Sequence, residues 1–379
     1  MKILLFGAIT PKGGIQTHMR FLSKMLADSG VKVLIIAPQL IEEEEPNQDG
    51  FVKNGIQLLY LKCDNSKVSK LSKFKEIIKA ANNFKPDVYY GIGTGWNLSL
   101  LPLILPKRVR SIFHEVMSGI PCGWNDPRWG VKWCFDEVVG QSPTVANTFV
   151  EYFGWQKKIA SLPAIPEPLE ITARLPQIKP KSVEIGKAKA ALFSRLVPHK
   201  RAFWLVQQWD LLKDVLSELH IHGTGLEEPL IRQYIEANGI GDRVKCFGRY
   251  PEGQAYVDLI SSYDLTLLPT LGDEGAPLVL LESLACGVPF VTYGVGGIAD
   301  YGVNNPNVII VPPEPWQNEQ AKDAATTANS TNNLFINAVR KMLVQLAEGE
   351  INQVELQKYY LDRYSYSVLK QAWLSYLCG

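Results

Sequence analysis

Short apolar runs alternate with helix-like stretches along most of this chain, and no other feature of the sequence restricts its fold as strongly. The runs lack the every-second-residue polarity of half-exposed strands, so they indicate parallel strands covered by helices on both faces. The sequence therefore predicts doubly wound α/β structure in both halves. The expected strands are 2–8, 31–38, 56–61, 87–93, 109–115 and 136–142 in the first half, and 190–194, 217–223, 244–248, 264–269, 288–293 and 307–313 in the second.

A proline-rich stretch separates the two halves of this pattern. Five prolines between Pro163 and Pro180 fall where no strand or helix periodicity survives, which is typical of a linker. Sheets of this kind bind ligands at the carboxyl ends of their strands, so a cleft between two such domains is the expected place of the site. We expect an N-terminal Rossmann-like domain over 1–165, a linker over 166–185, a C-terminal Rossmann-like domain over 186–355 and a helical tail over 356–379.

The charge balance and the cysteines limit the partners and the compartment. The 379 residues carry 39 Lys and Arg against 38 Asp and Glu, a net charge of +1, so no nucleic-acid partner is expected. The six cysteines are scattered without a C-x-x-C pair, which disfavours a disulfide framework or structural zinc and suits a reducing cytoplasm. The apolar start over 1–9 is too short for a signal peptide, and no apolar run reaches the roughly 18 residues of a membrane span. We expect a cytoplasmic protein.

Two glutamates frame the most unusual stretch of the sequence. Glu282 lies inside an expected helix over 277–286 that is otherwise almost entirely apolar, where a carboxylate needs several hydrogen bonds. The vicinal hydroxyls of a ribose can supply them, as can nearby backbone amides or a lysine. Glu274 comes eight positions earlier, just before the helix, where anions and hydroxyls bind and where acidic residues are also favoured without any ligand.

Two basic residues follow an expected strand of the second half. Arg195 and Lys200 come after the strand over 190–194, at the edge where a ligand should lie. Two fixed cations can neutralise a diphosphate as its charge grows on leaving, in place of a divalent metal. The sequence contains no D-x-D motif, so no metal-bridging aspartate pair is expected. The alternative is a pair of surface basic residues flanking a loop.

The order of these residues resembles the retaining family-4 glycosyltransferases of the GT-B fold. Glu274, seven intervening residues and Glu282 are similar to the E-x7-E signature of that family, and 194–200 resembles its G-R-L-x-x-x-K segment. The likeness is ordered over about 188–300 and weaker in the N-terminal half. The other matching points are Gly13-Gly14-Ile15, Phe113-His114-Glu115, Gly223-Thr224-Gly225, Val244–Gly248, Leu268-Pro269-Thr270 and Gly296-Gly297.

The chain departs from the family pattern at two places. Arg201 follows the lysine where the family usually has glycine, which adds a third positive charge near the expected phosphates. Ala276-Pro277 stands where Phe-Gly is commoner, and this change is expected to reshape the pocket of the donor sugar. Neither departure alters the class that the resemblance implies.

The resemblance implies two doubly wound Rossmann-like domains facing across a cleft, with the tail over 356–379 packing back on the N-terminal domain. It implies transfer of a hexose, with retention, from a nucleotide sugar to a hydroxyl of a saccharide or lipid-linked saccharide, in polysaccharide or glycoconjugate synthesis. UDP-glucose is the donor that the resemblance favours, and neither a metal nor another cofactor is implied. The implied catalytic residues are Arg195, Lys200, Glu274 and His114, and the implied donor-binding residues are Gly13, Gly14, Gly223, Gly225, Arg249, Pro269, Gly275, Ala276, Pro277, Leu278, Val279 and Glu282.

Several features of the N-terminal half allow a structural and a functional interpretation. Gly13 and Gly14 follow the first strand, where bare backbone amides can approach a phosphate or a hydroxyl, but the spacing is not the dinucleotide fingerprint. His114 ends the strand over 109–115, and the resemblance implies a contact with the donor sugar, whereas a lone histidine is commonly a satisfied core group. His18 is expected to be structural.

Tryptophans and lysines of the N-terminal half are candidates for contacts with the acceptor or with a membrane that carries it. Trp96, Trp124 and Trp129 can stack on sugar rings and are assigned to the acceptor, or they pack a long loop. The helix-like stretch over 67–79 carries five lysines beside apolar residues. It can contact an anionic membrane surface peripherally, which suits a lipid-linked acceptor, or simply cover its sheet. The oligomeric state is not predicted.

Two other functions remain open from the sequence. A nucleotide-sugar 2-epimerase uses the same two-domain fold, although the ordered R-x4-K and E-x7-E run favours transfer. A non-catalytic donor-binding protein would keep the fold and lose the charged residues that hold the donor. In this sequence Arg195, Lys200, Glu274 and Glu282 are all present. A dehydrogenase is disfavoured because no G-x-G-x-x-G follows the first strand.

Overall fold

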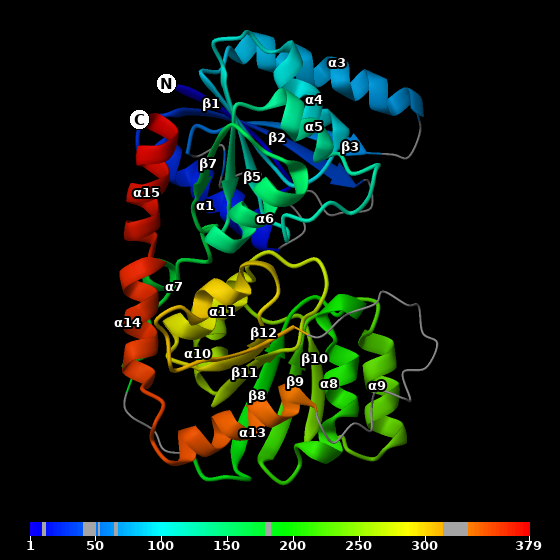
Figure 1. Ribbon diagram of the computed structural model, residues 1–379, viewed down its shortest axis with the longest axis vertical. Coiled ribbons are helices and arrows are strands. Elements are labelled where there is room, and N and C mark those ends of the chain that lie inside the picture. The colour runs from blue at the N-terminus through cyan, green and yellow to red at the C-terminus, as the bar shows by residue number, and fades with distance from the viewer. Residues whose placement is uncertain (10–12, 41–50, 52–53, 64–66, 179–182, 314–332) are drawn as a thin grey trace. The chain divides into compact units, whose positions relative to one another are not determined.

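The computed structural model describes residues 1–9, 13–40, 51, 54–63, 67–178, 183–313 and 333–379, and statements about the structure concern these ranges (Figure 1). The chain divides into two compact units. Unit 1 comprises Met1–Glu167 together with Tyr366–Gly379, and unit 2 comprises Pro168–Ser365.

Unit 1 is built on a seven-stranded parallel sheet with the order β3-β2-β1-β4-β5-β6-β7. The first strand is central, and its residues from Ile3 to Phe6 are apolar and buried. The order reverses between β1 and β4, which makes their carboxyl ends the switch point of this sheet. The strands are β1 (Lys2–Phe6), β2 (Lys32–Leu40), β3 (Gln57–Cys63), β4 (Val88–Ile92), β5 (Arg110–Glu115), β6 (Glu137–Gly140) and β7 (Lys158–Ser161).

Helices cover both faces of the sheet of unit 1, and two apolar clusters result (Figure 1). Successive side chains of a strand point to opposite faces, so Tyr90 belongs to the cluster under α1 and α15, and Tyr89 belongs to the other cluster. The helices are α1 (Gly14–Asp28), α3 (Lys67–Phe84), α4 (Trp96–Leu100), η1 (Leu101–Ile104), α5 (Trp129–Cys134), α6 (Pro143–Phe153) and α15 (Tyr366–Cys378).

Unit 2 repeats the architecture with a six-stranded parallel sheet of order β10-β9-β8-β11-β12-β13. Its switch point lies between the carboxyl ends of β8 and β11. The strands are β8 (Ala188–Phe193), β9 (Leu216–His222), β10 (Val244–Gly248), β11 (Leu265–Leu268), β12 (Phe290–Tyr293) and β13 (Ile309–Val311). The helices are α7 (Leu169–Thr172), η2 (Pro198–Lys200), α8 (Ala202–Gln207), η3 (Trp209–Leu211), α9 (Glu228–Ala237), α10 (Gln254–Ser261), α11 (Leu278–Ala285), η4 (Gly296–Gly302), α13 (Leu334–Ala347) and α14 (Gln353–Arg363).

The prediction of two doubly wound parallel sheets is confirmed, and every expected strand has its counterpart. The sequence pattern missed β7 and the four-residue α7, because both are short and lie at or within the proline-rich stretch. α14 groups with unit 2 and only α15 groups with unit 1. None of the helices in the described part of the chain combines the length and the apolar character that a membrane span requires.

Candidate functional site

The predicted donor residues of unit 2 converge on one edge of its sheet. Because all six strands are parallel, the loops after β8, β9, β10 and β11 leave from the same edge. The loop after β8 carries Arg195 and Lys200, and the loop after β11 leads through Glu274 to α11. β8 and β11 are neighbours in the sheet, so the two loops meet at the switch point.

Two glycines hold the loop after β8 in place. The Leu196 amide donates to the Thr224 carbonyl at 2.9 Å, and the Glu227 amide donates to the Leu196 carbonyl at 2.9 Å. A Cβ on Gly223 would lie 1.7 Å from the Ser194 carbonyl oxygen, and one on Gly225 would lie 2.4 Å from the Leu196 carbonyl oxygen. Both glycines also have positive φ, +139° and +153°, so only glycine fits these positions.

Lys200 and Glu274, predicted from different motifs, form an ion pair in the structure. The exposed fraction of the two side chains is only 9% and 14%, so water screens the pair poorly. The Thr270 hydroxyl donates to the same carboxylate at 3.3 Å and to the His199 carbonyl at 3.1 Å. The cation of the β8 loop and the carboxylate of the β11 loop therefore form one polar cluster.

His199, which the sequence analysis passed over, lies inside this cluster. Its carbonyl accepts from the Leu271 amide at 2.9 Å as well as from Thr270, so its backbone ties the two loops together. Burial and the neighbouring Lys200 charge lower the pKa of its imidazole. Its place between Pro198 and Lys200 in the basic motif was the available signal.

The glycine turn over 296–297 supports the loop that carries Glu274. The Gly297 amide donates to the Gly275 carbonyl at 2.7 Å, and a Cβ on Gly296 would lie 1.8 Å from the Glu274 carbonyl oxygen. α11 begins at Leu278, with Pro277 as its N-cap, and the segment 275–279 leads into its first turn. This close backbone packing fixes where Glu274 enters the cluster.

Glu282 lies within α11 and is 9% exposed. The hydroxyl of the fully buried Tyr256, on α10, donates to Glu282 Oε2 at 2.7 Å. Burial and the Glu282 charge raise the pKa of Tyr256 well above its usual value, so the phenol remains the hydrogen-bond donor. The sequence carries no signal for Tyr256, because a tyrosine in an apolar helix resembles an ordinary core residue.

The remaining cations of this edge lie in different surroundings. Arg195 and Arg249 are exposed at the ends of β8 and β10. Arg201 has left-handed backbone, with φ +56°, a conformation that glycine adopts more readily than other residues. Its guanidinium lies 3.9 Å from the Trp204 ring centroid and 5.7 Å from that of Tyr293. This cation therefore stacks on aromatic side chains of its own unit.

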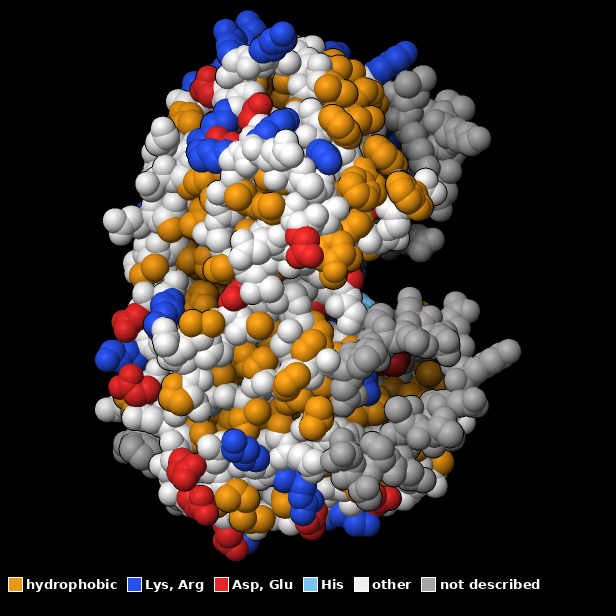
Figure 2. All heavy atoms as spheres, viewed as in Figure 1, with side chains coloured by type: hydrophobic (Ala, Val, Ile, Leu, Met, Phe, Trp, Pro, Cys, Tyr) orange, Lys and Arg blue, Asp and Glu red, His pale blue; other side chains and the backbone are white. Residues whose placement is uncertain are grey.

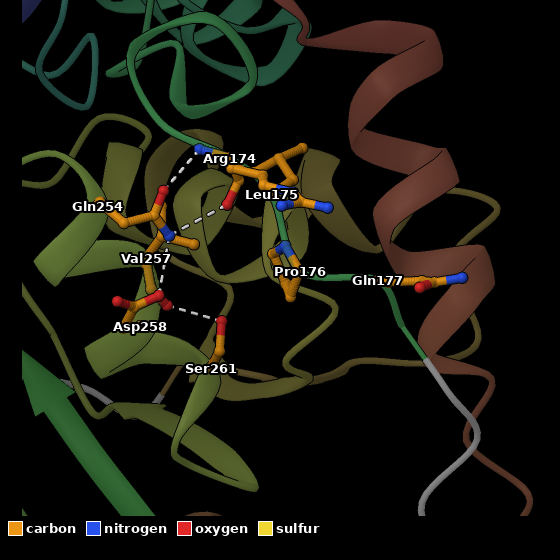
Figure 3. Close-up of a pocket in the computed structure, with 8 residues that line it drawn as sticks. All are labelled: Arg174, Leu175, Pro176, Gln177, Gln254, Val257, Asp258 and Ser261. Atoms are coloured by element: carbon orange, nitrogen blue, oxygen red, sulfur yellow. Dashed lines mark hydrogen bonds between the residues drawn. The ribbon is translucent and has the colours of Figure 1, made fainter.

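A separate pocket of unit 2 lies beside α10 (Figure 3). The Gln254 side chain accepts from the Arg174 amide at 2.8 Å and donates to the Arg174 carbonyl at 3.2 Å, so it holds the extended segment against the helix. None of the residues predicted from the sequence lines this pocket, and we do not assign it to the donor. Its lining residues are Arg174, Leu175, Pro176, Gln177, Gln254, Val257, Asp258 and Ser261.

In unit 1, His114 closes β5 and is fully buried. Tyr90 Oη lies 2.5 Å from His114 Nδ1, and no described residue forms a hydrogen bond with His114 Nε2. Burial lowers the pKa of His114 well below its usual value, so its imidazole is neutral. Gly13 is the N-cap of α1 and Gly14 its first residue, after β1 at the same edge of the sheet.

The tryptophans assigned to the acceptor lie on and between α4 and α5, where hydrophobic side chains gather on the surface (Figure 2). Trp96 is 48% exposed and Trp124 is 95% exposed. Trp129 differs from them, because its Nε1 donates to the Gly123 carbonyl at 3.0 Å and its ring centroid lies 4.8 Å from that of Phe153. Two of the three rings are therefore accessible, and the third packs the loop.

A buried arginine that the sequence analysis missed anchors the loop carrying Trp124. Arg128 is 1% exposed and forms ion pairs with Glu115 at 3.2 Å and Asp126 at 2.7 Å. It also donates to the Ile120 carbonyl at 2.6 Å. These contacts connect the loop to the end of β5, and loss of Arg128 would leave two buried carboxylates without their cation, at a cost of about 3–5 kcal/mol. A lone arginine in a loop gave no signal of burial.

Two further features concern the membrane and metals. The basic stretch over 67–79 is part of α3, and the side chains of Lys67 and Lys70 lie outside the described residues. Within the described ranges, no three His, Cys, Asp or Glu side chains come together in a way that could hold a metal ion.

Parts of this chain are similar to known proteins. A family model described as "Glycosyl transferases group 1" matches residues 188–330, the segment that carries Arg195, Lys200, Glu274 and Glu282. An exopolysaccharide phosphotransferase of Streptomyces coelicolor is 32% identical over 160 residues, which are 41% of this chain and only 16% of that protein. The family match supports the assignment of a glycosyl transferase class to this segment.

Solved structures extend the likeness to the whole fold. HepE of Anabaena, solved in complex with UDP, has a TM-score of 0.75 at 16% identity, with 100% of each chain covered. Sucrose-phosphate synthase of Thermosynechococcus elongatus has a TM-score of 0.75 at 14% identity, covering 99% of this chain and 98% of that one. The fold is therefore GT-B, as the sequence predicted, with two Rossmann-like units.

Proposed function

We propose that this protein is a retaining, metal-independent glycosyltransferase that moves a hexose from a nucleotide sugar to a hydroxyl of a saccharide or lipid-linked acceptor. The observation that carries the proposal is the meeting of Lys200 and Glu274 at the switch point of unit 2. Both residues lie in the segment that matches the family model. HepE has been solved with UDP and with UDP-glucose, which supports UDP-glucose as the donor.

In this proposal, unit 2 holds the donor through charge and hydrogen bonds. Arg195 and Lys200 neutralise the diphosphate as it leaves, and preorganised cations of this kind typically contribute a rate factor of about 10²–10³. Glu282 accepts hydrogen bonds from the ribose hydroxyls, and the bond from Tyr256 fixes the orientation of its carboxylate. Glu274 lies near the sugar. The backbone over 223–225 and 275–279 supplies the walls of the donor site.

The reaction requires no pair of carboxylates at hydrolase spacing. The acceptor oxygen forms its bond to the anomeric carbon on the face from which the phosphate oxygen departs. The hydroxyl proton passes to that phosphate oxygen, so the leaving group itself is the base. The product is a glycoside of unchanged anomeric configuration together with the nucleoside diphosphate.

Unit 1 supplies the acceptor surface in this proposal. Trp96 and Trp124 offer exposed aromatic faces, which stack well on sugar rings. Trp129 orders the loop between them instead of binding the acceptor directly, because its ring and its indole N–H are already engaged. The anchor at Arg128 keeps this loop in one conformation.

The first test compares nucleotide binding by the wild type and by Glu282→Ala. With UDP, GDP, ADP and their sugars in metal-free buffer, one nucleotide at 100 times its Kd should stabilise the wild type by about 2.7 kcal/mol, a shift of a few degrees in Tm. The Glu282→Ala protein should lose this shift, because the ribose hydroxyls lose their acceptor. An equal shift in both proteins would show that the carboxylate is structural. Product analysis without an acceptor would reveal an epimerase, which converts its donor alone.

Removal of divalent metals should leave the activity intact. Transfer measured with UDP-glucose and an acceptor saccharide should proceed at an unchanged rate in excess EDTA, because cationic side chains replace the metal at the diphosphate. The matched control adds Mg²⁺ or Mn²⁺ back to the treated enzyme. Loss of transfer in EDTA and its recovery with either metal would contradict the proposed mechanism.

A further inference from the structure

A continuous chain of hydrogen bonds runs through the buried interior of unit 1 and ends at His114. The Ile165 amide donates to His18 Nδ1 at 2.9 Å, and His18 Nε2 lies 2.7 Å from Tyr90 Oη. Tyr90 Oη lies 2.5 Å from His114 Nδ1. His18, Tyr90 and His114 are all 0% exposed, and the indole ring of Trp373 on α15 packs against each of them.

The donor and acceptor of each hydrogen bond in this series follow from the Ile165 amide, where the series begins. A backbone amide can only donate, so His18 Nδ1 is an acceptor and carries no proton. Burial lowers the pKa of His18 to about 3, so its imidazole is neutral and its single proton lies on Nε2. His18 Nε2 therefore donates to Tyr90 Oη, and the Tyr90 hydroxyl is left with one proton to give.

Within the described ranges, the acceptor for the Tyr90 proton is His114 Nδ1. If His114 Nδ1 donated to Tyr90 instead, the hydroxyl proton of Tyr90 would be buried without an acceptor, at a cost that folded proteins avoid. His114 therefore accepts at Nδ1 and carries its own proton on Nε2. That N–H is buried and has no hydrogen-bond partner among the residues that the structure describes.

We propose that the Ile165 amide, His18 and Tyr90 form a relay that holds His114 as the tautomer protonated on Nε2, so that unit 1 presents one unpaired N–H donor to a sugar oxygen. The relay residues are positioning residues, since only His114 would touch the ligand. The neighbouring strand ends and the packing of Trp373 hold the ring itself. The ligand side of this inference rests on the proposed transferase function; the tautomer does not.

The relay restricts what His114 can recognise. A neutral imidazole with its proton on Nε2 can donate to a hydroxyl or ether oxygen of a sugar, but it cannot accept a proton from the reacting hydroxyl at that atom. It therefore acts as a hydrogen-bond donor and not as a general base. His18, which was expected to be merely structural, becomes part of the recognition of the sugar.

Nitrogen-15 NMR of histidine-labelled protein tests the tautomer directly. The chain has five histidines, and His18→Gln and His114→Gln variants assign the two relevant signals. In the wild type, His18 and His114 should each show a protonated Nε2 and an unprotonated Nδ1. In Tyr90→Phe, the His114 Nδ1 loses its donor, so a mixture of both tautomers should appear. A protonated Nδ1 in the wild type, or a single unchanged tautomer in Tyr90→Phe, would overturn the relay.

Tyr89→Phe is the matched control for the same measurement. Tyr89 is the adjacent residue of β4, is equally buried, and donates to the Leu98 carbonyl at 2.9 Å on the other face of the sheet. Both substitutions remove one buried hydroxyl, but Tyr89→Phe should leave the His114 signals unchanged. A change of the His114 tautomer in both variants would mean that any loss of a buried hydroxyl in β4 disturbs the packing enough to move the proton, and would contradict the relay.

Kinetics test whether the tautomer matters for recognition. With UDP-glucose as donor, Tyr90→Phe should lower kcat at least about tenfold with unchanged UDP affinity, whereas Tyr89→Phe should behave as the wild type. A normal kcat in a Tyr90→Phe protein of mixed tautomer would show that the His114 N–H faces only a buried water or the Trp373 ring, which would overturn the ligand role. Should no transfer occur with any nucleotide sugar, the proposed function fails and with it the ligand role, while the NMR result still decides the relay.

Discussion

Turnover of the Lys200→Ala protein at saturating donor is expected to fall by about 10²–10³-fold. The cation is needed most when the diphosphate gains charge in the transition state, so the loss should appear in kcat more than in KM. Initial-rate transfer assays with UDP-glucose, run beside the wild type, measure this directly. Because Arg195 is proposed to act on the diphosphate together with Lys200, Arg195→Ala should cause a comparable loss.

The ion pair of Lys200 with Glu274 complicates a simple alanine substitution, because it leaves a poorly exposed carboxylate without its cation. Urea unfolding of the variant should therefore accompany the kinetics. The pair Lys200→Met and Glu274→Gln restores neutrality, so the double variant should recover stability but not turnover. Lys189→Ala is the matched control, since Lys189 forms an ion pair with Glu218 at 2.6 Å while its side chain is 46% exposed. A near-normal kcat in Lys200→Ala would remove this residue from the diphosphate site.

Gly223→Ala is expected to destabilise unit 2 and to abolish nucleotide binding. Its Cβ would meet the Ser194 carbonyl oxygen at 1.7 Å, and neither partner can move without moving a strand end. The backbone of this residue also has φ +139°, which is strained for alanine. Because both effects act on the folded state, we expect the free energy of unfolding to fall by about 3 kcal/mol or more. Urea unfolding measures this loss, and calorimetry with UDP at a temperature where the variant is folded measures the binding.

Gly239→Ala separates the steric effect from the general cost of replacing a left-handed glycine. Gly239 has φ +61°, and no atom lies within 4 Å of the position its Cβ would take. This variant should lose only about 1–2 kcal/mol and should bind UDP normally. Equal behaviour of the two variants would mean that the packing of the 223–225 loop on the strand end does not shape the site.

The sequence predicted the architecture, and it placed Lys200 and Glu274 at the same edge of one sheet, for an identifiable reason. Parallel strands are apolar throughout, and the glycines and charged residues that follow them must gather at one edge. Lys200 and Glu274 are far apart in the chain, yet their positions after neighbouring strands brought them into contact. Topology alone therefore carried this part of the prediction.

The residues that the sequence did not reveal are defined by polar contacts of their side chains. Tyr256 resembles a core residue until its hydroxyl is seen on Glu282, and Arg128 resembles a surface residue until its buried ion pairs with Glu115 and Asp126 are seen. The identity of His18 as a relay member depends on the Ile165 amide, 147 positions away. Periodicity reports which face of an element is apolar, but not which polar atoms meet beneath it.

The loop over 194–200 is fastened at both of its ends. Gly223 and Gly225 lie against its first residues, and the left-handed Arg201 stacks on Trp204 just after its last. Such a loop loses its conformational entropy once, when the chain folds, and does not lose it again when a ligand arrives. Under the proposed function, a diphosphate would meet a loop backbone that needs no further ordering, and its affinity should respond more to ionic strength than to substitutions that only loosen neighbouring surface loops.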